Sequence, residues 1–184
     1  MSGAHTTLAP PPREAQATAR AGTTSIRLRA GERRDLDRVN AVIAAAMDTW
    51  GLPERVKRLS LPLYRYAAQD LEHLDLVVAE TAGGCIVGVA AIEAADTPDR
   101  AHGHNPALLH GLYVEPRHHG QGIGGRLMAH TSKLAVSRRF DTLLVRARQQ
   151  AASFFEAHGL RRVDAIDAAR DYPWRYVLDL PTGG

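Results

Sequence analysis

The stretch "LYVEPRHHGQGIGGRLM", residues 112–128, carries the most specific structural pattern in this chain. It joins the end of an apolar strand to a segment with helical spacing of apolar residues, and four of the eight residues His118–Gly125 are glycine. Glycines at a helix start let backbone N–H groups converge on an anion, where the helix dipole adds roughly half a positive charge. The stretch therefore predicts a phosphate-binding loop between a strand and a helix. The plainer alternative is a tight connection that binds nothing.

Two nucleotide-binding motifs also place glycines between a strand and a helix. Gly120, Gly122 and Gly125 satisfy G-x-G-x-x-G, the dinucleotide motif. That motif places its first glycine almost directly after a strand and an acidic residue at the end of the next strand. Here "EPRHH" intervenes, and Asp141 begins the next strand instead of ending it. A P-loop would need Gly-Lys-Ser/Thr, which is missing. Both motifs, and with them a nucleotide-dependent oxidoreductase, are disfavoured.

The composition is that of one folded, soluble domain. The chain has 184 residues, of which 45% are hydrophobic and 23% charged, as is ordinary for a globular protein with a core. The formal net charge is only +3 and aromatic residues make up 5%, so we expect no nucleic-acid partner. The apolar runs are all shorter than the roughly 18 residues of a membrane span, so we expect no membrane association either.

The single cysteine and the N-terminal residues bear on the compartment. Cys85 lies in the apolar run "CIVGVAAI", so we expect a buried free thiol and a reducing compartment. The first residues, "MSGAHTTLAPPP", lack the charged start and apolar middle of a secretory signal, which favours a cytoplasmic location. Histidines cluster at residues 102–104 and 118–119 without the spacing of zinc ligands, so we expect no metal.

The pattern along the chain predicts the order of elements. Residues 1–24, rich in Ala, Thr and Pro, predict a disordered tail before one domain at 25–184. A helix from Asp35 is stopped by Gly51, and the following segment predicts one or two short helices broken at Pro62. Further helices are expected after the glycine loop and at 149–159. Strands are expected at 25–30, 73–80, 85–93, 107–114, 141–147, 161–166 and 174–180.

This order predicts an α/β (α+β) fold, with a mixed, mostly antiparallel sheet of six to seven strands flanked by about four helices. The stretch at 112–128 resembles motif A of the GCN5-related N-acetyltransferase (GNAT) superfamily, in which Val-x-Pro precedes Arg/Gln-x-x-Gly-x-Gly/Ala and a long helix. The resemblance extends over about residues 25–180. "FFEAHGL", residues 154–160, lies where such proteins carry an aromatic pair followed by Gly-Phe. It implies a V-shaped splay between the strands around 107–114 and 141–147.

The resemblance implies acetyl-coenzyme A as co-substrate, without a metal. Its pyrophosphate would bind the backbone of the loop residues His119, Gly120, Gln121, Gly122, Ile123, Gly124 and Gly125. His119 replaces the family's Arg or Gln, and an imidazole there would make cofactor affinity fall between about pH 6 and 8.

The pantetheine arm would enter the V-shaped splay. The backbones of Leu112 and Val114, on either side of Tyr113, would pair with the arm and polarise the thioester carbonyl. Gly111 in mid-strand is consistent with a bulge or with a packing accommodation.

Acetyl transfer to an amine needs loss of a proton from the ammonium and protonation of the departing thiolate. His110 is the candidate base, at the position of the second of two strand histidines in the superfamily's arylalkylamine branch, and Glu93 is the backup base or ammonium anchor. The family's thiolate acid is a tyrosine, replaced here by Phe155, which would remain an apolar wall for the pantetheine. Water would then protonate the thiolate, or a neighbouring hydroxyl would: Ser153, Tyr172 or Tyr113.

The implied function is acetyl transfer from acetyl-coenzyme A to a primary amine, of a small molecule, by direct attack without a covalent enzyme intermediate. The alternatives are a non-catalytic acyl-coenzyme A-binding module and a protein lysine or N-terminal acetyltransferase. The partners would be acetyl-coenzyme A and the amine acceptor, with the chain a monomer or homodimer. The acceptor would contact residues 50–70 and 94–106, where Asp96 and Asp99 suit a cation and Trp50, Leu63 and Tyr64 suit an apolar body.

Overall fold

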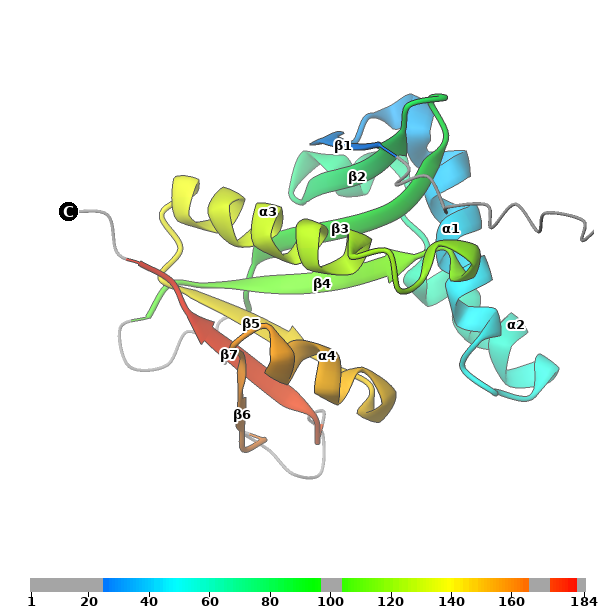
Figure 1. The fold of residues 1–184 in the computed structure, drawn as a ribbon. Coiled ribbons are helices and arrows are strands. Elements are labelled where there is room, and N and C mark those ends of the chain that lie inside the picture. Colours follow the sequence, from blue (N-terminus) through cyan, green and yellow to red (C-terminus); the bar gives the residue numbers. More distant parts are fainter. Residues whose placement is uncertain (1–24, 97–103, 166–172, 182–184) are drawn as a thin grey trace, which may run out of the picture.

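A computed structural model of the chain describes residues 25–96, 104–165 and 173–181. Within them, seven strands form one sheet in the order β1-β2-β3-β4-β5-β7-β6 (Figure 1). Only β4 and β5 pair in parallel among these strands, and the other neighbours are antiparallel. The predicted mixed, mostly antiparallel sheet is thus confirmed.

The elements follow the predicted order. The strands are β1 (Ile26–Ala30), β2 (Asp75–Thr81), β3 (Ile86–Ala94), β4 (Pro106–Val114), β5 (Thr142–Arg146), β6 (Arg161–Val163) and β7 (Arg175–Asp179). The α-helices of the described residues are α1 (Leu36–Asp48), α2 (Glu54–Tyr64), α3 (Ile123–Ser137) and α4 (Ala152–Ala157). Short 3-10 turns are η1 (Arg33–Asp35), η2 (Ala68–Glu72), η4 (Pro116–His118) and η5 (Gln149–Ala151).

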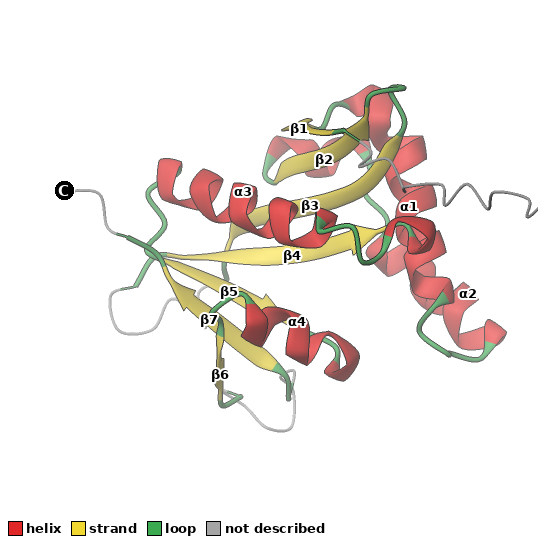
Figure 2. Cartoon of the chain, viewed as in Figure 1, coloured by secondary structure: helices red, strands yellow, loops and turns green. Residues whose placement is uncertain are grey.

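Helices cover both faces of the sheet (Figure 2). On one face, α3 and α4 bury Leu127 and Phe155 against alternate strand residues such as Val87. On the other, α1 buries Val39 and Ile43 against the intervening strand residues. Because strand side chains alternate between faces, the unbroken apolar run of β3 supplies both clusters.

A β-bulge interrupts β4 in its middle. Ile92 of β3 pairs with Leu109, but the next pair is Ala91 with Gly111, so His110 is an extra residue on β4. The bulge reverses which residues face which helices beyond it. Leu109 before the bulge and Leu112 after it both pack in the α3 cluster, although they are an odd number of residues apart. The bulge suggested by Gly111 in the sequence is therefore present.

The sheet opens between β4 and β5. Their pairing runs from Pro106 with Thr142 to Leu109 with Val145, and β4 then continues to Val114. Figure 1 shows the two strands diverging toward the end of the sheet where the glycine loop begins. The predicted V-shaped splay is confirmed.

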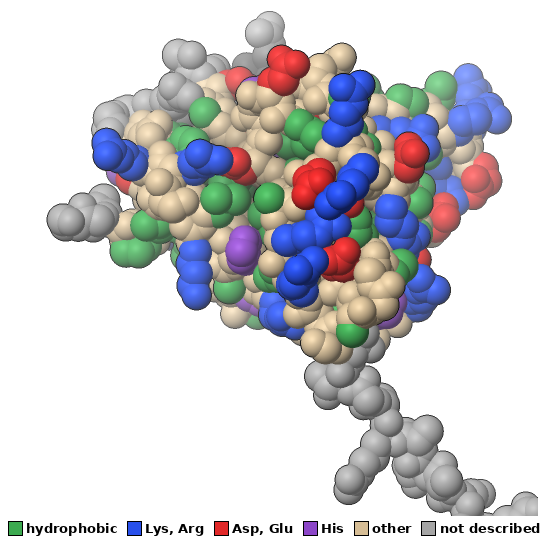
Figure 3. All heavy atoms as spheres, turned by 90° about the horizontal axis from the view of Figure 1, so that it is seen from above, with side chains coloured by type: hydrophobic (Ala, Val, Ile, Leu, Met, Phe, Trp, Pro, Cys, Tyr) green, Lys and Arg blue, Asp and Glu red, His purple; other side chains and the backbone are tan. Residues whose placement is uncertain are grey.

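An ion-pair cluster ties β1 to β2 and to η1. The Arg29 guanidinium donates to Asp35 at 2.6 and 3.0 Å and to Glu80 at 3.2 Å, and Arg27 donates to Glu80 at 2.8 Å. Hydrogen bonds from Arg29 and then Arg27 lower the pKa of Glu80 to about 2. Seen from the β1 side, basic and acidic side chains lie next to each other on this surface (Figure 3).

Two local predictions were wrong. Cys85 is exposed, because the first residue of its apolar run belongs to the β2–β3 turn: its N–H donates to Thr81 Oγ1, and β3 begins only at Ile86. Pro62 does not break its helix, because α2 runs through it to Tyr64. The carbonyl that loses its intrahelical partner there can be hydrated, since none of the residues of α2 is buried.

Candidate active site

The end of β4 is fixed by Glu115. Its carboxylate accepts hydrogen bonds from Arg38 of α1 at 2.8 Å and from Arg117 at 3.0 Å, while Arg38 Nε donates to the Ile86 carbonyl at 2.8 Å. Burial raises the pKa of Glu115, but the bonds from the two guanidinium groups outweigh it and leave the pKa lowered. The start of the glycine loop is therefore held against α1 and β3.

Two glycines give the loop its shape. Gly120 and Gly122 have φ values of 73° and 75°, which glycine adopts without the steric cost of a Cβ, and Gly122 is the N-cap of α3. The helix begins at Ile123, three residues earlier than a loop ending at Gly125 would place it. The hydrogen bond from the Arg126 N–H to the Gly122 carbonyl, at 3.1 Å, spans four residues as in an α-helix. The N–H groups of residues 123–125 precede that of Arg126 and lack helical acceptors, so this helix start has the geometry of an anion cradle.

Helix α4 approaches the first turn of α3 closely. A Cβ on Gly124 would lie 3.1 Å from the Phe154 ring, and one on Gly125 would lie 2.7 Å from His158 Nε2. Of the aromatic pair, it is thus Phe154 that lies against the loop. Phe155 is buried and stacks on Tyr176 at 6.1 Å.

His119 folds back onto the strand that precedes it. Its Nε2 donates to the Val114 carbonyl at 2.8 Å. A carbonyl oxygen only accepts, so Nε2 carries the proton of this contact. His119 thereby closes the loop over the end of β4, and its ring is exposed to solvent.

The backbone of β4 beyond the bulge presents polar groups to the splay. Glu115 N–H donates to the Val87 carbonyl, and Tyr113 is paired with Val89 two residues earlier. Antiparallel pairing alternates along the strand, so the residues on either side of Tyr113 direct N–H and C=O away from β3. Leu112 and Val114 are those residues, and they face the side on which β5 has diverged.

Polar side chains gather on the face of the sheet that α1 covers. His110 Nε2 lies 3.9 Å from Glu93 Oε1, and His110 Nδ1 lies 3.3 Å from the Tyr66 hydroxyl. The Glu93 and His110 side chains are 25% and 40% exposed, so both remain accessible. Burial raises the pKa of the Tyr66 phenol well above its ordinary value, and nearby Tyr113 and Glu93 raise it further.

The sequence pattern did not predict Tyr66 as a residue of this site. It is held by a reciprocal pair of hydrogen bonds with Asn40 of α1: Asn40 Nδ2 donates to the Tyr66 carbonyl and Tyr66 N–H donates to Asn40 Oδ1, both at 2.9 Å. No local spacing marks these two residues as partners, so only the packing of α1 against the segment after α2 brings Tyr66 to His110.

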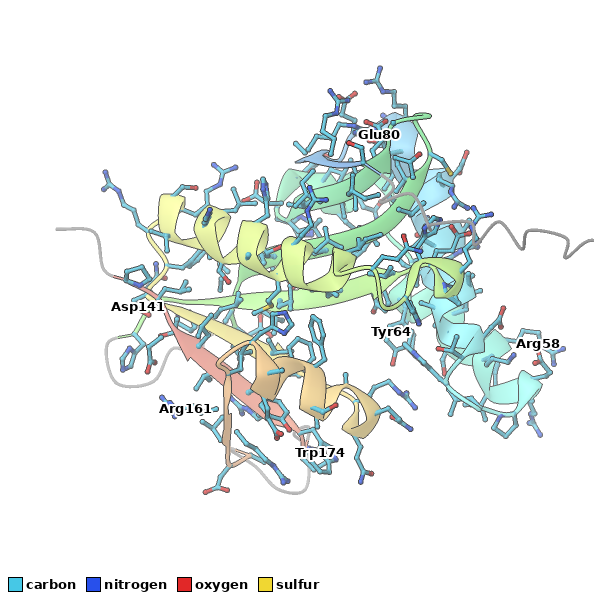
Figure 4. All side chains as sticks on the ribbon, in the orientation of Figure 1. Arg58, Tyr64, Glu80, Asp141, Arg161 and Trp174 are labelled. Atoms are coloured by element: carbon cyan, nitrogen blue, oxygen red, sulfur yellow. The ribbon has the colours of Figure 1, made fainter. Side chains whose placement is uncertain are left out.

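An aromatic wall continues this face toward the open end of the splay. Trp50 lies 5.3 Å from Tyr64 and 6.5 Å from Tyr113, measured between ring centroids. The Tyr113 ring covers Gly111, where a Cβ would lie 2.4 Å from Tyr113 Cε2. Figure 4 shows Tyr64 at this end of the splay and Arg58 on the outer side of α2.

The remaining predicted residues lie apart from these groups or outside the described residues. Leu63 is 79% exposed, and Asp96 and Ser153 are exposed. Asp99, Tyr172 and the tail at residues 1–24 lie outside the described residues. Where the chain is described, no three His, Cys, Asp or Glu side chains gather as a metal site would require. No described helix has the length and apolarity to cross a membrane.

Comparisons with known proteins agree with this architecture. Residues 72–161 match the acetyltransferase (GNAT) domain family. No curated protein matches the chain in sequence.

Several solved structures share the fold. PaiA N-acetyltransferase from Thermoplasma acidophilum, in complex with coenzyme A, is 16% identical with a TM-score of 0.69, over 84% of this chain and 99% of that one. A GNAT acetyltransferase from Staphylococcus aureus Mu50 is 13% identical with a TM-score of 0.64, over 85% and 100%. One from Brucella melitensis, in complex with acetyl-coenzyme A, is 17% identical with a TM-score of 0.58, over 88% and 94%. With its glycine loop, bulged strand and splayed sheet, the chain has a GNAT-type fold, and residues 72–161 match the GNAT domain family.

Proposed function

We propose that this protein is an acetyl-coenzyme A-dependent N-acetyltransferase that acetylates a primary amine of a small molecule by direct attack. One observation carries the proposal. The splay between β4 and β5 opens the sheet between an anion cradle on the α3 side and the Glu93–His110–Tyr66 group on the α1 side. A thioester reaching through this opening would meet an amine held on the opposite face.

The cradle would hold the pyrophosphate through the N–H groups of residues 123–125. The backbone of Leu112 and Val114 would pair with the pantetheine arm, with the Leu112 N–H directed at the thioester oxygen, where it would stabilise the tetrahedral oxyanion. Val114 O is already the acceptor of His119, so binding of the arm there would compete with that contact. Coenzyme A and acetyl-coenzyme A in the Thermoplasma and Brucella structures support this assignment of the co-substrate.

On the α1 side, the substrate ammonium would lie between Glu93 and His110. With Nδ1–H donating to the Tyr66 oxygen, His110 Nε2 is left with a lone pair that faces Glu93 and takes the proton from the ammonium. The amine nitrogen then attacks the thioester carbon and the C–N bond forms. The nitrogen gives up its second proton to solvent as the C–S bond breaks and the thiolate leaves. The raised pKa of Tyr66 keeps the phenol neutral, so Tyr66 orients the imidazole.

The departing thiolate must be protonated without the family's tyrosine. Phe155 has no hydroxyl and packs on Tyr176 in the core. Water entering through the open end of the splay, or Tyr113 beside Leu112, would supply the proton.

The absent hydroxyl also favours a second candidate, a non-catalytic acyl-coenzyme A-binding module. Calorimetric titration with coenzyme A combined with a thiol-release assay over a panel of primary amines separates the two. Coenzyme A binding with amine-dependent thiol release is expected. Binding without any such release would favour the module, and absence of binding would remove both.

A further inference from the structure

Arg148 lies at the open end of the splay on the α1 side. Leu143, Val145 and Ala147 pack in the α3 cluster, so alternation directs Arg148 to the opposite face of the sheet. Its guanidinium carbon lies 4.4 Å from the centre of the Trp50 ring. This contact joins the residue two positions after β5 to the residue two positions after α1.

The guanidinium of Arg148 is held in place without an anionic partner among the described residues. Its Nε is buried and has no hydrogen-bond partner. By contrast, Arg138 at the C-terminal end of α3 donates two hydrogen bonds to Asp75 at 2.6 and 2.9 Å. A buried N–H of a charged group is costly to leave without a partner. The Arg148 guanidinium is therefore poised to donate hydrogen bonds to an anion.

The contact with Trp50 leaves the outer N–H groups of the Arg148 guanidinium available to bind an anion. A guanidinium packed against an aromatic ring can still donate from its outer N–H groups, and their planar fork matches the two oxygens of a carboxylate. The stack on Trp50 also reduces the side-chain freedom that would be lost when such an anion binds.

Arg148 is linked to the proposed amine site by a continuous wall. From His110 the surface passes to Gly111, covered by the Tyr113 ring, and from Tyr113 to Trp50 at 6.5 Å. The Arg148 guanidinium packs against the Trp50 ring. One end of this wall therefore presents Glu93 and His110 to a cation, and the other presents a guanidinium to an anion.

We propose that the acceptor is an amine that also carries a carboxylate, with its amino group at Glu93 and His110, its carboxylate at Arg148, and its apolar part on Trp50 and Tyr113. The inference rests on the proposed acetyl transfer, whose acceptor class it names. It also excludes the cofactor phosphates as the partner of Arg148, because the anion cradle lies on the α3 side of the sheet.

The test compares matched acceptors with the wild-type protein and an Arg148→Met variant. The probes are free α-amino acids, their carboxamides, which lack the negative charge, and the series glycine, β-alanine, 4-aminobutyrate and 5-aminopentanoate, which varies the spacing of the two groups. Binding to the coenzyme A-loaded protein is measured by calorimetry, and turnover by thiol release. Methionine keeps an apolar stem against Trp50, and Arg148→Lys retains the charge without the planar fork.

The wild-type protein is expected to favour a carboxylated amine over its uncharged counterpart. Arg148→Met should weaken that amine roughly tenfold to hundredfold, in Kd and in KM, with the carboxamide unaffected. Arg148→Lys should fall between the two. Arg27→Met, at an arginine whose side chain is 72% exposed on β1, should leave all values unchanged. Unchanged coenzyme A affinity shows that each variant is folded.

The results separate this inference from the proposed function. Equal use of carboxylated and uncharged amines, equal losses for both in Arg148→Met, or no binding of any carboxylated probe overturns the inference and leaves acetyl transfer standing if any amine releases thiol. Carboxylated amines that bind through Arg148 without any thiol release would support the anion subsite while refuting acetyl transfer.

Discussion

Nε2 of His110 lies 3.9 Å from Oε1 of Glu93, and the β4 bulge produces this relationship. Glu93 is paired with Leu108, and His110 is the additional residue that the bulge inserts before Gly111. In a regular ladder without a bulge, His110 would instead be paired with a residue of β3. The bulge instead re-aims its side chain toward Glu93 and Tyr66, as bulges next to active sites commonly do.

Replacing His110 by Ala should lower kcat by about 10²- to 10⁴-fold, because general-base catalysis contributes that much. Coenzyme A affinity should be unchanged, since the cradle lies on the other face of the sheet. Steady-state thiol release and calorimetry measure the two quantities. His73→Ala, at an exposed histidine before β2, is the control. An unchanged kcat in His110→Ala would show that His110 is not the base.

Replacing Gly122 by Ala should weaken coenzyme A binding and lower the free energy of unfolding by about 1 kcal/mol, because a Cβ is strained at a φ of 75°. Gly84 in the β2–β3 turn has a φ of 79° and nothing within 4 Å of the position of a Cβ, as at Gly122. Gly84→Ala should therefore lose similar stability and keep full coenzyme A affinity. Urea unfolding and calorimetry distinguish the two variants, and equal affinity losses would argue against the cradle.

Acid should destabilise the fold partly through Glu80. The pKa of Glu80 is about 2 in the folded protein, below the ordinary 4.5, so the unfolded chain binds the proton more readily. The stabilisation is complete above about pH 5 and is lost as the pH falls toward 2. In urea unfolding across this range, Glu80→Gln should be less stable than wild type at pH 7 and show a shallower acid slope. Glu72→Gln, at an exposed glutamate, should keep the wild-type slope, and an unaltered slope in Glu80→Gln would contradict the prediction.

Local sequence patterns predicted the features that depend only on residues close together in the chain. Apolar alternation and continuous apolar runs placed the strands, and glycines at Gly120 and Gly122 marked the loop because the backbone turns there require positive φ. The same reasoning failed where a pattern ran past its element. Cys85 shares an apolar run with β3 but belongs to the turn, and Pro62 is tolerated near the end of a solvated helix.

The amino-acid sequence alone determined the order of the elements and the glycine loop, because these follow from spacing and backbone conformation along one segment. The resemblance to the GNAT superfamily added His110 as a candidate base. The tertiary structure decided which side chains meet. Tyr66 reaches His110 through the packing of α1, and Arg148 reaches Trp50 across the open end of the splay. Such contacts join segments far apart in the chain, and they depend on a bulge and on a divergence of strands that no local periodicity encodes.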